Sequence, residues 1–92
     1  MAVNYIIVIH KDFDSDYGVT VPDLPGCFSA GNDLDQALEN AKEAIECHLE
    51  GLLADNEVIP KRQSLEIHQK NQDYQGGIWA VVSVELPILS IY

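Results

Sequence analysis

Residues 33–53, DLDQALENAKEAIECHLEGLL, have the clearest structural pattern in this sequence. Asp33 is placed as an N-cap, and Gln36 follows three residues later, where the partner of a capping box belongs. The apolar residues of the stretch recur at helical spacing, which puts them on one side: Leu34, Leu38, Ala41, Ile45, Leu49 and Leu52. We therefore predict a helix from about Leu34 to Leu53 whose apolar stripe packs on a sheet.

Four other segments have strand patterns. The first contains Tyr5 to Ile9, which are rich in β-branched side chains and apolar at successive positions, as in a strand covered on both faces. A polar, acidic turn separates it from the next strand, which is typical of a hairpin. The predicted strands cover residues 3–10, 17–21, 27–30 and 78–86.

The order strand, strand, strand, helix, strand predicts an α+β fold, with an antiparallel-type sheet of about four strands packed on one long helix. Pro22-Asp23-Leu24-Pro25-Gly26 interrupts the strands, and its prolines and glycine predict a stiff, turned loop. Residues 64–71 fit either a short second helix or an irregular connector. A length of 92 residues fits a single domain, residues 1–92.

The charge of the chain narrows the class of partner. Fifteen acidic against five basic residues give a formal charge of −10, which opposes binding to nucleic acid or to anionic membranes. The same charge would attract a basic protein, although it also serves solubility. Without a membrane-length apolar stretch, a signal-peptide pattern or paired cysteines, the chain is expected in the cytoplasm.

Acidic residues suggest two metal sites, and each has a simpler interpretation. Asp12, Asp14 and Asp16 alternate as in a calcium-binding EF-hand, but Tyr17 stands where that loop needs glycine, so an acidic turn is preferred. On the predicted helix, glutamates four residues apart (Glu39 with Glu43, Glu46 with Glu50) are placed to hold a divalent ion or to form a solvated face. We expect the solvated face, and no metal or cofactor.

The candidate catalytic side chains are equally unspecific. His10, His48 and His68 are widely separated, and only His48 falls on the predicted helix, where it borders the apolar stripe as a half-buried residue. Cys27 has no basic neighbour that would lower its thiol pKa and is interpreted as a small apolar strand residue. We therefore expect no catalytic residue.

One long stretch resembles a known family. Residues 17–31, YGVTVPDLPGCFSAG, followed by residues 34–45, LDQALENAKEAI, are similar to the HicB antitoxin family. The resemblance is specific because a strand, the P-D-L-P-G-C loop, a glycine and an acidic, alanine-rich helix occur in one order. It implies a partial RNase H-like domain that neutralises HicA, a small basic toxin that cleaves messenger RNA. The alternative is a small metal-dependent RNase H-like hydrolase that uses the acidic residues.

The charge and the resemblance together suggest where partners bind. The hypothesis for the toxin is the stiff loop and the acidic helix face, with these residues: Asp23, Leu24, Pro25, Gly26, Phe28, Glu39, Glu43 and Glu46. For a homodimer or higher oligomer it is the apolar tail, with Ile88, Leu89, Ile91 and Tyr92. The family implies a C-terminal DNA-binding module as well, which residues 1–92 lack, so we expect no duplex DNA binding by them.

Overall fold

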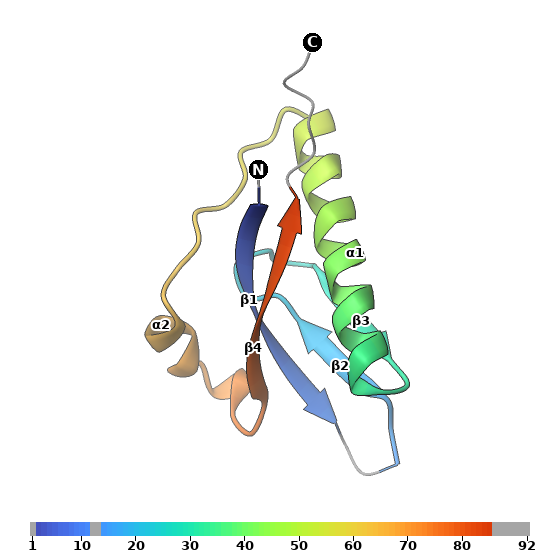
Figure 1. The fold of residues 1–92 in the computed structure, drawn as a ribbon. Helices are drawn as coiled ribbons and strands as arrows, with labels where there is room; N and C mark the ends of the chain where they lie inside the picture. Colours follow the sequence, from blue (N-terminus) through green and yellow to red (C-terminus); the bar gives the residue numbers. More distant parts are fainter. Residues whose placement is uncertain (1, 12–13, 86–92) are drawn as a thin grey trace.

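The sheet of this protein has four antiparallel strands in the order β3-β2-β1-β4, and a long helix lies across one of its faces (Figure 1). The computed structural model describes residues 2–11 and 14–85. The elements in chain order are β1 (Ala2–Lys11), β2 (Tyr17–Thr20), β3 (Phe28–Gly31), α1 (Leu34–Ala54), α2 (Leu65–Gln69), the 3-10 turn η1 (Gln72–Tyr74) and β4 (Ile78–Glu85). The predicted α+β class and the predicted succession of elements along the chain are confirmed, and of the two possibilities for residues 64–71 the structure has the short helix, α2.

Helix α1 begins where the capping pattern predicted. The Asp33 carboxylate accepts a hydrogen bond of 2.8 Å from the Gln36 backbone N–H. The Gln36 side chain accepts one of 2.7 Å from the N–H of Asn32, one residue before the position of an ordinary capping box. These bonds satisfy backbone donors at the helix start, so the chain turns into α1 directly after β3.

The predicted apolar stripe of α1 is confirmed except at its start, because Leu38, Ala41, Ile45, Leu49 and Leu52 all belong to the core or pack against it. Its buried residues are Ala37, Ala41, Ile45 and Leu49, whereas Leu34 is 42% exposed. Gly31 of β3 accounts for the burial of Ala37, because even a Cβ atom on Gly31 would collide with the Ala37 backbone. Helix and strand therefore approach closely at Ala37, and Leu34 lies outside the contact.

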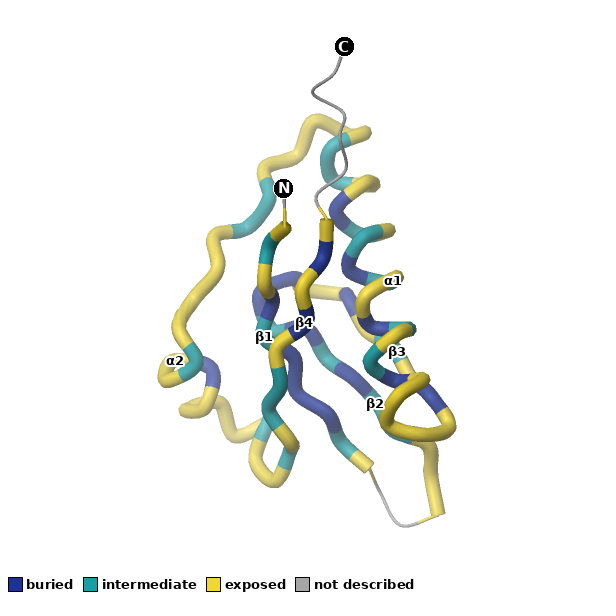
Figure 2. Tube along the Cα trace, viewed as in Figure 1, coloured by how far each residue is buried: buried dark blue, intermediate teal, exposed yellow. Residues whose placement is uncertain are grey.

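The core lies between α1 and the sheet, where the dark blue segments of Figure 2 face each other. Tyr5, Ile7 and Ile9 are the side chains of β1 that face α1. They pack with the buried side chains of neighbouring strands, which are Val19, Val82 and Val84. This alternation places the intervening residues of β1 on the opposite face of the sheet.

The opposite face of the sheet is covered in part by the segment between α1 and β4. There Val8 is buried, and a Cβ atom on Gly77 would collide with its side chain, so this segment packs directly on β1. The rings of Tyr74 and Trp79 meet edge to face with 5.8 Å between their centroids. Coverage on both faces accounts for the continuous apolar pattern of β1.

Candidate protein-binding surface

The loop between β2 and β3 is folded inward. The Leu24 N–H donates to the Val21 carbonyl at 3.0 Å, and the Cys27 N–H donates to the Leu24 carbonyl at 3.0 Å. Gly26 has a φ of +85°, a backbone conformation that glycine adopts more readily than residues with a side chain. These two turns bury the Leu24 side chain completely and expose Pro25 and Gly26.

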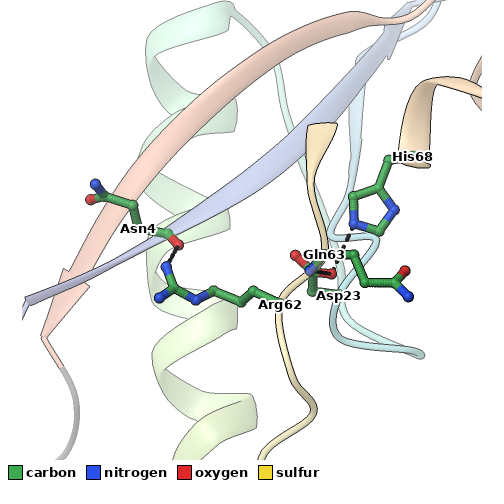
Figure 3. A network of polar contacts seen from close by, with 5 residues as sticks. All are labelled: Asn4, Asp23, Arg62, Gln63 and His68. Atoms are coloured by element: carbon green, nitrogen blue, oxygen red, sulfur yellow. Dashed lines mark hydrogen bonds and ion pairs between the residues drawn. The ribbon is translucent and has the colours of Figure 1, made fainter. Parts of the chain in front are cut away.

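Asp23 connects this loop to a distant part of the chain (Figure 3). One of its carboxylate oxygens, Oδ1, lies 2.8 Å from Nε2 of His68 and accepts a hydrogen bond of 2.9 Å from the Gln63 backbone N–H. Both Asp23 and His68 are buried, and Oδ2 of Asp23 is buried without a hydrogen-bond partner. The pair therefore fastens α2 and the segment before it to the β2–β3 loop.

The residues predicted to bind the toxin do not all lie on one exposed surface. Leu24 has no exposed surface and Asp23 has only 6%, so both support the loop from inside and are removed from the hypothesis. Phe28 is 65% exposed, but it pairs with Thr20, which pairs with Val8, and these three share the sheet face opposite to α1. A partner that contacts both Phe28 and α1 must therefore reach around the β3 edge.

The acidic face of α1 is a continuous surface. Its exposed carboxylates are Asp35, Glu39, Glu43 and Glu50, and Glu46 is half-buried beside them. Lys42 is the only lysine or arginine of the helix. Residues four apart lie on successive turns, so these charges form a row along the helix that opposes the core. Such a row attracts a basic surface over its whole length.

A groove between β1 and the chain after α1 was missed by the sequence interpretation. Val3 and Tyr5 of β1 line it on one side and residues 59–64 on the other, around about 640 Å³ of space. The Arg62 guanidinium crosses it, donates to the Asn4 carbonyl at 2.7 Å and lies 5.9 Å from the centre of the Tyr5 ring. The sequence feature that could have indicated this groove is the adjacent pair Lys61 and Arg62, which is unusual in so acidic a chain.

The structure shows where the candidate metal-ligating and nucleophilic side chains of the described residues lie. Across residues 2–11 and 14–85, no group of three His, Cys, Asp or Glu side chains is close enough to hold a metal ion. Cys27 is buried, and burial raises the pKa of its thiol, which disfavours the reactive thiolate. His68 faces Asp23 in the interior, while His48 on α1 is half-buried, as predicted. Nothing in this arrangement favours the hydrolase alternative.

Comparisons with known proteins agree with one another. A family model described as "HicB_like antitoxin of bacterial toxin-antitoxin system" matches residues 5–91. An uncharacterised 14.9 kDa protein from the rep-hol intergenic region of Haemophilus phage HP1 is 49% identical over 82 residues, which is 89% of this chain and 61% of the phage protein. This chain therefore spans less than two thirds of that relative.

Solved structures share the fold. The antitoxin HicB of Burkholderia pseudomallei is 41% identical with a TM-score of 0.80, over 91% of this chain and 64% of that one. A chain of the HicA3 and HicB3 toxin-antitoxin complex is 28% identical with a TM-score of 0.69, over 92% of this chain and 99% of that one. No helix in the described part of the chain is both long and apolar enough to cross a membrane. By the family match over nearly its whole length and by its fold, the chain belongs to the HicB-like antitoxins of bacterial toxin-antitoxin systems.

Proposed function

We propose that this chain is an antitoxin that binds and neutralises a HicA-type toxin, a small basic protein that cleaves messenger RNA. The observation that carries the proposal is the family match over residues 5–91. A relative of the same fold is known in a HicA3 and HicB3 complex, which supports a toxin of this type as the partner. The chain acts by binding and has no enzymatic role.

The acidic face of α1 supplies the attraction. A net charge of −10 on a chain of 92 residues creates a field that a basic toxin meets before contact, which accelerates encounter. The row Glu39, Glu43 and Glu46 then covers the toxin surface that would otherwise hold RNA. Because the RNA that such a toxin cleaves is in the cytoplasm, we place the encounter there.

The exposed part of the β2–β3 loop adds a rigid contact. Pro25 and Gly26 lie at its tip, and the loop beneath them is held by internal hydrogen bonds and by the Asp23 contacts with Gln63 and His68. A loop that is already ordered loses little conformational entropy when it docks. The ordered loop therefore gives the binding surface a defined shape in addition to its negative charge.

Co-purification tests the proposal. The chain is expressed with an affinity tag together with a HicA-type toxin from the same genome, and the eluate is analysed by size-exclusion chromatography. We expect the two proteins to elute together at 150 mM salt, where exposed charges are already partly screened. Recovery of the tagged chain without the toxin, when both proteins are present in the lysate, would contradict the proposal.

A further inference from the structure

The first half of β1 has a strand on one side only. β4 pairs with β1 from Ala2 to Ile9, whereas β2 pairs with it only from Val8 to Lys11. β1 lies between β2 and β4 in the sheet, but β2 does not extend along residues 2–7. This part of β1 therefore has a free edge on the β2 side. The adjoining segment, residues 59–64, lies beside this edge but does not pair with it (Figure 1).

The backbone groups on the free edge can be identified. The Asn4 carbonyl accepts from the Arg62 side chain, so it points away from β4. Backbone groups alternate in direction along an antiparallel strand, so the Asn4 N–H points the same way, as do the groups two residues before and after it. This is the pattern that an added strand requires for pairing.

The groove beside this edge is preformed. Its far wall is residues 59–64, which Pro60 stiffens and which the Gln63 N–H ties to the buried Asp23 carboxylate at 2.9 Å. Ile59 packs against the core at the base of this wall. Because both walls are fixed, an extended peptide can enter the groove without first ordering it.

The charge of the groove differs from that of the rest of the surface. Lys61 and Arg62, two of the five basic residues in the chain, are exposed on its wall. Burial raises the pKa of the Tyr5 hydroxyl, with the Arg62 charge acting in the opposite direction, so the hydroxyl stays neutral at physiological pH. A guanidinium next to free backbone donors and acceptors matches an extended segment that carries a carboxylate side chain.

We infer that the groove between β1 and residues 59–64 binds an extended segment of the toxin, which adds a strand to the free edge at Asn4 and places an Asp or Glu against Arg62. This rests on the proposed function. In the unbound chain the Arg62 guanidinium occupies the hydrogen-bonding position of the missing strand, and in the complex it turns to the carboxylate. The toxin is then held at two places of opposite charge, its basic surface by α1 and its acidic strand by the groove, which fixes its orientation.

Residue-resolved amide hydrogen exchange tests the inference. Exchange is measured for the whole chain, free and in complex with a HicA-type toxin from the same genome. We expect exchange at the Asn4 amide to slow by about tenfold or more in the complex, because a strand hydrogen bond protects it. The Val8 amide, in the half of β1 that β2 already covers, is the control and is expected to be protected in both states.

Three results would overturn the inference, and they differ from one another. A complex that forms without protection at Asn4 refutes the groove and leaves the proposed function intact. Failure of the two proteins to associate refutes both. Protection of Asn4 in the free chain that increases with its concentration identifies a second copy as the occupant.

A pair of variants tests the carboxylate contact. Arg62→Gln and Lys70→Gln each remove one exposed positive charge, but Lys70 lies at the end of α2, outside the groove. We expect Arg62→Gln to weaken toxin binding about fivefold, the upper range for an exposed ion pair, and Lys70→Gln to leave it unchanged. Circular dichroism confirms that both are folded. Equal or tighter binding by Arg62→Gln, relative to Lys70→Gln, would refute the contact.

Discussion

At the scale of single residues, Asp23 shows where sequence reasoning about this chain succeeded and where it failed. The prolines and glycine around it predicted a turned loop, and the structure has two hydrogen-bonded turns there. The same pattern suggested that Asp23 and Leu24 face a partner, yet both are buried. The reason is a contact with His68, which lies 45 residues later in the chain. No local sequence pattern predicts such a contact, because the contact depends on how α2 packs against the β2–β3 loop.

The first prediction concerns this buried carboxylate. Asp23→Ala should lower the free energy of unfolding by about 2–4 kcal/mol, because the Gln63 N–H and the His68 ring both lose a buried partner. Urea denaturation followed by tryptophan fluorescence measures the change. Glu57→Ala is the control, since it removes an exposed carboxylate and should cost less than about 0.5 kcal/mol. Equal midpoints for the two variants would show that Asp23 does not fasten the loop.

At the scale of elements, helix α1 was the most predictable part of the chain. Its capping residues and its helical period are local features of the sequence. They predicted its first residue, Leu34, correctly and its last residue, Ala54, to within one position. The start of its buried stripe is not set by local sequence. It depends on Gly31 of β3, where the close approach selects Ala37 for the contact and leaves Leu34 exposed. The groove beside β1 was missed for a similar reason, because the early end of β2 is a property of strand pairing.

The second prediction concerns the acidic face of α1. The triple variant Glu39→Gln, Glu43→Gln and Glu46→Gln should slow association with a HicA-type toxin about threefold or more at low salt, and should weaken the salt dependence of the rate. Stopped-flow or surface plasmon resonance measures both quantities. The dissociation rate should change less, since steering acts mainly before contact.

A matched variant separates the α1 face from total charge. Glu57→Gln, Glu66→Gln and Asp73→Asn remove three exposed charges outside α1. This control should slow association less than the α1 variant, because its charges are not collected on one face. If the two variants associate at the same rate, net charge and not the α1 row governs the encounter.

At the scale of the whole molecule, the composition leads to expectations about partners, and these stay predictions. The acidic charge led us to expect a basic protein partner, and the family match is to antitoxins of toxin-antitoxin systems. The absence of duplex DNA binding by residues 1–92 stays a prediction. The residues proposed for oligomer contact, Ile88, Leu89, Ile91 and Tyr92, lie outside the described residues, so that hypothesis also stays open to experiment.

The third prediction is self-association. β4 is an edge strand of the sheet, and Ile78 and Val81 on it are 57% and 61% exposed. An exposed apolar edge strand favours pairing with another chain. We expect light scattering at micromolar concentration to give at least twice the mass of one chain, and Val81→Lys to lower that mass. A single-chain mass across the concentration range would contradict the prediction.

The most direct test of the antitoxin assignment is inhibition of RNA cleavage. A HicA-type toxin from the same genome is incubated with a fluorescently labelled RNA, and the chain is added in increasing amounts. Binding that covers the RNA-binding surface predicts that the cleavage rate falls in proportion to the added chain and stops near one chain per toxin. Cleavage that continues undiminished in the presence of excess folded chain would contradict the proposal that this protein neutralises the toxin.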